Sequence, residues 1–295
     1  MDYKTFEKAL REELEKYYPI KESVIEKYGY GKINAFHIVT GSKFQPMIYP
    51  SFSYENFKNG MSVEKIVSDY LKTINNQSNE LEWVNKLLEN PKEEILKLVV
   101  PVLYYKPFFK DGVYENLEWS DDIVKAYLVK KENDESGATI LIKDELMKKT
   151  DISFNELKTS AERNIENKVF YIEDIENTMI SLLSGAKNNK IKISPSMERI
   201  DDLSNLYVVT VKDMIRGSNV LLREDILRDI TVAFGKTFYI LPSSLHEILV
   251  CPCDERMNVE MLKDMVRETN ATQVDKSEWL SNNIYYFDGN KLKQC

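Results

Sequence analysis

Cysteine and histidine are scarce in this sequence, with three and two residues among 295. An odd and low number of cysteines argues against a disulfide framework and fits a reducing cytoplasm. No apolar run approaches the about 20 residues that a membrane span needs, and the first residues lack the basic and then apolar pattern of a signal peptide. Basic residues are also fewer than acidic ones, with 40 Lys and Arg against 48 Asp and Glu, which gives a net charge of −8. The sequence therefore predicts a cytoplasmic protein with no membrane association and no direct nucleic-acid binding.

Apolar and aromatic residues are abundant. They make up a hydrophobic fraction of 43 %, with 17 Tyr and 12 Phe, which is enough for a sizeable core. The opening MDYKTFEKALREELEKYY predicts an amphipathic helix with Phe6, Leu10 and Leu14 on one face, and two strands are expected around the turn at 28–31. Further helices are expected over 62–73, 80–88 and 91–100. Residues 1–110 are thus expected to form a helix-rich N-terminal region with a β-hairpin.

The chain also contains an internal similarity between residues 126–147 and 206–227. AYLVKK followed by GATILIKDELM in the first segment matches LYVVTV followed by GSNVLLREDIL in the second, in register from the shared glycine onward. Each segment is typical of two strands and a helix that begins with acidic residues, which suit its N-terminal dipole. Two copies are too few for a solenoid. We therefore expect an α+β fold whose second part, residues 111–295, is a pseudo-duplicated ββα-type core with a mainly antiparallel sheet and repeat units near 123–167 and 206–270.

The stretch LPSSLHEIL places two serines, a histidine and a glutamate between two apolar runs. A catalytic interpretation makes Ser243 or Ser244 the nucleophile, His246 its base and Glu247 the orienting acid. Against it, His246 and Glu247 are neighbours whose side chains would point to opposite faces of an extended segment, and no G-x-S-x-G elbow is present. The structural interpretation is a capping box, in which Ser244 and Glu247 satisfy each other's backbone donors in one helical turn. The pattern favours the structural interpretation, so no catalytic residue is assigned.

Metal and phosphate sites meet similar objections. His246, Glu247, Cys251 and Cys253 could be drawn as a metal-binding set, but their spacing gives neither a C-x₂₋₄-C pair nor an H-E-x-x-H helix. The GYGK segment at 29–32 lacks both the earlier glycine and the following Ser or Thr of a P-loop. We therefore expect no cofactor and no metal.

Several segments together resemble an uncharacterised bacterial domain-of-unknown-function family, which occurs in chromosomes and in integrative or conjugative elements. The resemblance rests on AYLVKK, GATILIKDEL, FNELKTSAERN, FYILPSSLHEIL, LKDMVRETN and WLSNNIYYFD, and PSSLHE at 242–247 is its most recognisable motif. Ser218 and Asn219 depart from the alanine-rich small residues expected after the glycine. The resemblance implies no established activity, cofactor or substrate. It suggests a cytoplasmic accessory protein carried by a mobile element.

The acidic balance, the lack of a catalytic set and this resemblance favour a non-enzymatic role. We expect a protein-binding accessory factor, of the counter-defence type, that acts on another protein. The alternative is a serine- and histidine-dependent hydrolase with its site at 242–247. A third interpretation is a sensor of a small ligand or peptide, for which Tyr239, Tyr285 and Tyr286 could line an aromatic pocket. The sequence identifies neither the protein partner nor an oligomeric state.

Overall fold

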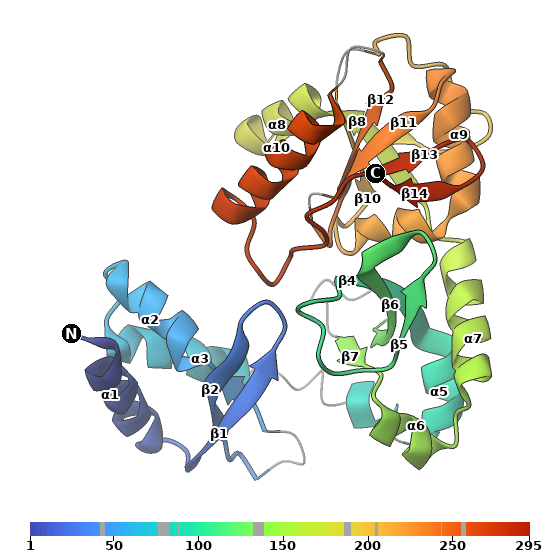
Figure 1. The fold of residues 1–295 in the computed structure, drawn as a ribbon. Coiled ribbons are helices and arrows are strands. Elements are labelled where there is room, and N and C mark those ends of the chain that lie inside the picture. The colour runs from blue at the N-terminus through green and yellow to red at the C-terminus, as the bar shows by residue number, and fades with distance from the viewer. Residues whose placement is uncertain are drawn as a thin grey trace. The chain divides into compact units, whose positions relative to one another are not determined.

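The computed structural model is an α+β protein with 41 % helix, 27 % strand and mainly antiparallel sheets (Figure 1). The fold class expected from the sequence is therefore confirmed. The structure describes residues 1–41, 45–75, 83–85, 87, 89–131, 139–185, 190–203, 206–242, 244–254 and 258–295. It divides into two compact units, Met1–Pro91 and Lys92–Cys295, so the boundary expected near residue 110 falls inside the second unit. None of the helices in these described ranges is long and apolar enough to cross a membrane.

The first unit combines three helices with a small antiparallel sheet. Its elements are α1 (Tyr3–Glu15), β1 (Ile20–Lys27), β2 (Gly31–Ile38), β3 (Met47–Ile48), α2 (Pro50–Lys58) and α3 (Val63–Asn75), with the strands in the order β1-β2-β3. Phe6, Leu10 and Leu14 are buried because their spacing places them on one face of α1, where they pack with residues of β2 and α3. The predicted first helix and hairpin are confirmed. The helix expected at 80–88 lies mostly outside the described residues.

The second unit begins with a four-stranded sheet. Its elements are α5 (Pro91–Leu98), β4 (Val99–Tyr105), β5 (Tyr114–Leu117), β6 (Ser120–Lys130), β7 (Thr139–Leu141), α6 (Asp144–Thr150) and α7 (Phe154–Glu166). The strands are ordered β4-β6-β5, and β7 also pairs with β6. The sequence does not predict β4, because Pro101 indicates the end of a helical segment. Within the described residues β4 pairs with β6 alone, and such an edge strand accommodates a proline that cannot donate a hydrogen bond.

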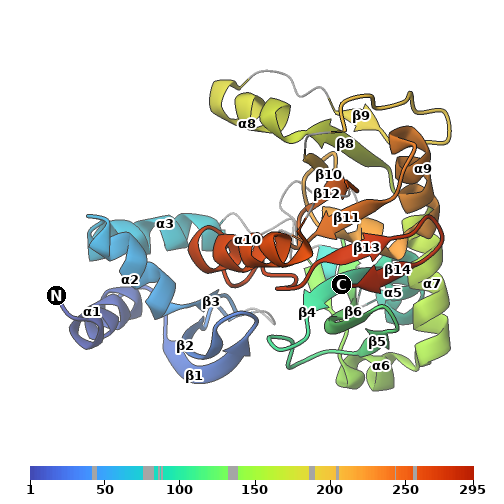
Figure 2. The same ribbon diagram turned by 45° about the horizontal axis from the view of Figure 1, so that its top comes forward.

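A seven-stranded antiparallel sheet forms the rest of the second unit (Figure 2). Its elements are β8 (Phe170–Asp174), α8 (Ile175–Ser184), β9 (Ile191–Lys192), β10 (Tyr207–Val211), the 3-10 helix η1 (Gly217–Leu222), α9 (Glu224–Phe234), β11 (Phe238–Leu241), β12 (Ile248–Pro252), α10 (Val259–Thr272), β13 (Tyr285–Phe287) and β14 (Leu292–Gln294). The strands are ordered β14-β13-β11-β12-β10-β8-β9. Helices α8 and α10 lie on one face of this sheet and α9 on the other (Figures 1 and 2).

The two similar segments adopt different structures. In the first, β6, β7 and α6 form the expected strand, strand and helix. In the second, β10 and α9 are a strand and a helix, but residues 220–222 belong to η1, so the second strand expected there is wrong. The reason lies in tertiary packing. The N–H of Gly217 donates to the carbonyl of His246 at 3.0 Å, and this bond draws the chain onto the corner between β11 and β12 instead of into a hairpin.

Candidate functional site

The corner between β11 and β12 is held by its own polar groups. Ser244 is buried, donates its hydroxyl to Glu247 Oε1 at 2.7 Å, and accepts the backbone N–H of His246 at 2.9 Å. The predicted contact between Ser244 and Glu247 is therefore present, but the segment forms a turn and not the helical start that a capping box needs. Ser243, the other serine candidate, lies outside the described residues.

The ring of His246 meets groups from two other segments. Its Nδ1 accepts the backbone N–H of Arg216 at 3.4 Å, and its Nε2 lies 3.7 Å from Oε1 of Glu278. An accepting Nδ1 leaves the proton of the neutral ring on Nε2, on the side of Glu278. The fold thus pairs Ser244 with Glu247 and His246 with Glu278. A nucleophilic relay needs the base to reach the hydroxyl, and these contacts join two separate pairs instead.

The backbone of the corner anchors the loop that follows β10. The carbonyl of His246 accepts the Gly217 N–H and the Thr210 hydroxyl, the latter at 2.8 Å. The neighbouring carbonyl of Leu245 accepts the Ser218 hydroxyl at 2.7 Å. Thr210 and Ser218 are both buried, so each bond satisfies a polar group that water does not reach. The geometry of residues 244–247 is that of a structural anchor.

The loop between β10 and η1 contains two non-glycine residues in the left-handed region. Met214 has a φ of 54° and Arg216 a φ of 60°, a conformation that costs about 1–2 kcal/mol per residue. Contacts of the Arg216 side chain offset this cost, since its guanidinium lies 4.6 Å from the centre of the Tyr104 ring and donates to the Tyr104 hydroxyl at 2.8 Å. The Arg216 side chain therefore attaches the loop before η1 to Tyr104 on β4.

The cysteines of the proposed metal set belong to the core and its margin. Cys251 is buried under α10 with Leu241 and Val266, Cys253 is half-buried, and neither forms a disulfide. Burial raises the pKa of the Cys251 thiol to about 11, so this thiol stays protonated at neutral pH and is a poor metal ligand. Among the described residues, no group of three His, Cys, Asp or Glu is arranged to hold a metal ion.

Tyr285, one of the three tyrosines considered for a ligand pocket, belongs to a buried hydrogen-bond network. Tyr285 is fully buried and donates its hydroxyl to Asp122 Oδ1 at 2.5 Å, with Ser120 also in contact at 2.8 Å. Oδ2 of Asp122 accepts from Ser281 at 2.6 Å and from the side-chain amide of Asn283 at 2.9 Å. Burial and the nearby carboxylate raise the pKa of Tyr285. The network joins the start of β6 to β13, so Tyr285 connects the two sheets.

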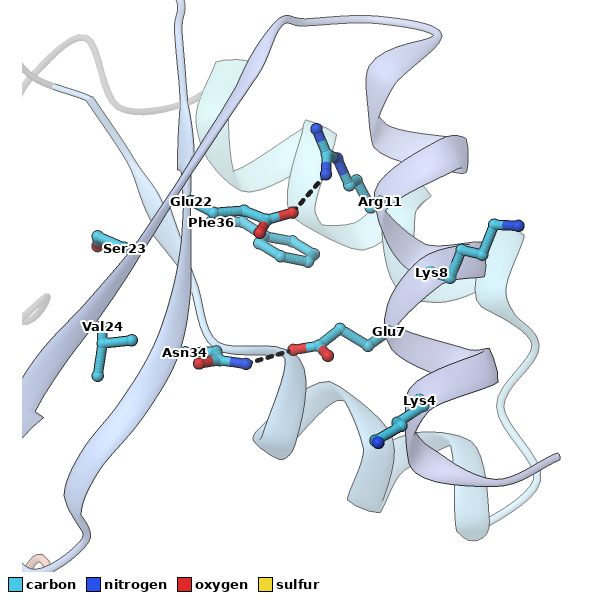
Figure 3. Close-up of a pocket in the computed structure, with 9 residues that line it drawn as sticks. All are labelled: Lys4, Glu7, Lys8, Arg11, Glu22, Ser23, Val24, Asn34 and Phe36. Carbon is cyan, nitrogen blue, oxygen red and sulfur yellow. Dashed lines mark hydrogen bonds and ion pairs between the residues drawn. The ribbon is translucent and has the colours of Figure 1, made fainter.

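The first unit contains a pocket of about 390 Å³ between α1 and the β1–β2 hairpin (Figure 3). Two polar bridges cross it. Arg11 contacts Glu22 at 2.6 Å, and the Asn34 amide donates to Glu7 at 2.9 Å. Figure 3 shows the Phe36 ring between these bridges. The lining also includes Lys4 and Lys8, so three cations face two carboxylates and the pocket is a small polar cleft with a slight excess of positive charge.

The hairpin carries a contact that sequence reasoning missed. Ser23 Oγ lies 2.6 Å from His37 Nε2, and both side chains are half-buried. In the β1–β2 register Ser23 faces Ala35 and His37 faces Lys21, so Ser23 and His37 are diagonal neighbours on one face of the sheet. Correct hairpin pairing would have revealed this contact. We interpret it as a cross-strand hydrogen bond that stabilises the hairpin.

Three large apolar side chains of helix α8 are exposed to solvent. Met179, Ile180 and Leu183 are 57 %, 58 % and 87 % exposed, and we call these three residues the α8 face. Its inward side carries the buried hydroxyl residues Thr178 and Ser181. Helices at a protein surface normally show the opposite arrangement, so sequence periodicity alone would place the α8 face inward. Sequence reasoning missed this surface for that reason.

The sheet beneath α8 explains the inversion. The Thr178 hydroxyl donates to Oε2 of Glu173 on β8 at 2.9 Å, and Glu173 is only 4 % exposed. In the register of β8 and β10, Glu173 and Tyr171 lie opposite Val208 and Thr210, on the same face. This part of the sheet therefore presents polar groups to α8. The helix contacts them through the Thr178 hydroxyl and leaves Met179, Ile180 and Leu183 exposed.

Comparison with known proteins supplies a family and no activity. Neither a curated protein nor a solved structure matches the chain. One family model matches residues 3–289, which is nearly the whole chain and includes both compact units. The protein therefore belongs to DUF5688, a family of unknown function.

Proposed function

We propose that the protein is a non-enzymatic binding factor that holds another protein on the α8 face. The single observation that carries this proposal is the inverted helix, with Met179, Ile180 and Leu183 exposed above buried hydroxyl residues. Large apolar side chains grouped on a surface mark contact sites, because covering them removes apolar area from water. Their spacing puts all three on one side of α8, so a single partner surface can contact them together.

The charge beside α8 indicates the chemistry of the partner. Glu176 in the first turn of α8 and Lys192 on β9 are both exposed, so the surroundings of the α8 face carry charge of both signs. A partner with an apolar surface and a rim of mixed charge would therefore complement this region. A second copy of the chain fits less well, because a symmetric contact through the α8 face would bring the exposed Glu176 of each copy towards the other. We commit to a different protein as the occupant.

We further propose that this binding takes place in the cytoplasm of a bacterium, where the protein serves as an accessory factor of a mobile element, of the counter-defence type. Three free cysteines support a reducing compartment. The mobile-element role is supported by the sequence resemblance alone. Its test is the genomic neighbourhood of family members, where recombination or conjugation genes should recur.

The α8 face is tested by site-specific photo-crosslinking in the cells that produce the protein. A photoreactive amino acid at Ile180 or Leu183 should give one dominant adduct with another protein. The same group at Val232, which is 72 % exposed on α9, should not give it. An adduct between two copies of the chain, or no adduct specific to α8, would overturn the proposal.

Reconstitution with the crosslinked protein then measures the contact. Ile180→Asp and Leu183→Asp should each weaken binding of the purified partner at least tenfold, because a carboxylate would be buried against its apolar surface. Val232→Asp is the matched control and should leave the dissociation constant unchanged. Equal affinity for all variants would show that the partner binds elsewhere and would refute this assignment.

A further inference from the structure

A second recognition feature lies at the far edge of the seven-stranded sheet, on β14. The Cys295 N–H donates to the carbonyl of Ile284 at 3.0 Å, so Cys295 and every second residue before it turn their backbone groups towards β13. Leu292 and Gln294 consequently turn theirs outward. No described residue hydrogen-bonds to the outward N–H or C=O of either one. Such an open edge is a template for another strand.

A cavity of about 420 Å³ lies directly beside this open edge. One side of it is β14, and the other is the turn between β5 and β6, which contributes Trp119. The Trp119 ring is half-buried and packs edge-on against Tyr285, with ring centres 5.4 Å apart. The Asp121 N–H donates to the Gln294 side chain at 3.0 Å and joins the two sides. The open edge therefore faces a groove with an aromatic wall.

The charges around the groove favour a basic occupant. Its rim carries three carboxylates and two lysines, namely Glu118, Asp121, Glu224, Lys291 and Lys293. Two of these groups already form ion pairs, Lys293 with Asp288 at 2.6 Å and Glu224 with Arg228 at 3.6 Å, which leaves two carboxylates and one lysine for an occupant. Glu118 and Asp121 are both exposed on either side of Trp119, and within the described residues neither has an ion-pair partner. A lysine or arginine in the groove would meet these carboxylates.

We propose that this groove binds an extended, basic segment of a partner polypeptide, which pairs with β14 as an additional strand. The outward N–H and C=O groups of Leu292 and Gln294 would bond to the backbone of the segment, and Trp119 would hold an apolar side chain. The basic side chains of the segment would lie on the face that carries Gln294, beside Asp121, and its alternate, apolar side chains would lie beside Lys291 and Lys293. Pairing of two copies is disfavoured, because it would bring Lys291 and Lys293 of both β14 strands together. This site is separate from the α8 face, and its test does not depend on that proposal.

Amide hydrogen exchange measured by NMR on the full chain tests the pairing. The probe is the capped peptide Val-Lys-Val-Lys-Val-Lys-Val, compared with the same peptide carrying Glu in place of Lys. At saturation the Lys peptide should slow exchange of the Leu292 and Gln294 amides at least tenfold, because these N–H groups become hydrogen-bonded. No slowing, or equal slowing by the Glu peptide, would overturn the proposal.

Two variants keep the test independent of folding. Glu118→Lys combined with Asp121→Lys changes exposed side chains only, and it should weaken binding of the Lys peptide at least tenfold. Glu145→Lys, an equally exposed change on α6, is the matched control and should leave binding unaltered. Ile180→Asp on the α8 face should also leave it unaltered, which separates failure of this site from failure of the proposed function. Equal binding by the double variant and the control would refute the role of the acidic rim.

Discussion

Replacing Gly217 by alanine tests whether residues 244–247 anchor the fold. An added Cβ would lie 2.3 Å from the carbonyl oxygen of His246, 2.5 Å from the Thr210 hydroxyl oxygen and 2.8 Å from the Thr210 Cα. Two of these three are backbone atoms, so rotating a side chain cannot relieve the overlap. Either η1 or the corner between β11 and β12 must move.

The cost of that movement can be estimated from the bonds it breaks. Separation would lose the bond from the Gly217 N–H to His246 and strain those from Thr210 and Ser218, each worth about 1 kcal/mol. Overpacking adds about 1–3 kcal/mol. We therefore expect Gly217→Ala to lower the free energy of unfolding by about 3–5 kcal/mol, which for a unit of this size lowers Tm by about 2–4 °C per kcal/mol.

Urea denaturation of the full chain, followed by circular dichroism, measures this loss. Gly185→Ala is the control, since Gly185 has a φ of 67° and its added Cβ would meet no atom within 4 Å. That variant isolates the cost of a left-handed alanine, about 1–2 kcal/mol, with no steric overlap. If Gly217→Ala is no more destabilising than Gly185→Ala, the corner is not packed against η1 and the anchor interpretation fails.

Three further predictions concern buried or hydrogen-bonded groups. Hydrogen bonds from Ser153 lower the pKa of Glu156 from 4.5 to about 2, so the stabilisation by its carboxylate is present above about pH 4.5 and is lost as the pH falls towards 2. Glu156→Gln should therefore make the free energy of unfolding, measured with urea, less dependent on pH between 4.5 and 2. An unchanged pH dependence would contradict this. Tyr285→Phe should cost about 1–3 kcal/mol in urea, because the carboxylate of Asp122 loses a buried donor, and a neutral result would contradict the network. The Cys251 thiol should react with iodoacetamide at pH 7.5 only as the protein unfolds, and rapid labelling of the native protein, seen by mass spectrometry, would show that it is accessible.

Local pattern was sufficient for the elements whose structure depends on near neighbours. The spacing of Phe6, Leu10 and Leu14 defines the buried face of α1, because residues three and four apart share one side of a helix. The turn at 28–31 likewise fixes the register of β1 and β2, since a short connection leaves few ways to pair two strands. The contact between Ser244 and Glu247 followed from their separation of three residues.

Tertiary contacts decided the rest. Pro101 lies in β4 because that strand is at an edge, a position that only the assembled sheet defines. Residues 220–222 match a strand in sequence, yet the bond from Gly217 to the distant His246 carbonyl selects a 3-10 helix. The ring of His246 meets Glu278, far from it along the chain, instead of its neighbour Glu247.

For the candidate interaction surfaces, too, sequence pattern determined some features and tertiary contacts determined others. The sequence by itself determined that the chain is acidic, has an ample core and belongs to the α+β class, since these depend on composition and short-range periodicity. Glu173 on β8 decided which side of α8 faces solvent. Its buried carboxylate accepts a hydrogen bond from Thr178, so the hydroxyl side of the helix packs on the sheet and Met179, Ile180 and Leu183 stay exposed. The open edge of β14 was decided by strand order in the same way, because an edge exists only once the other strands have paired.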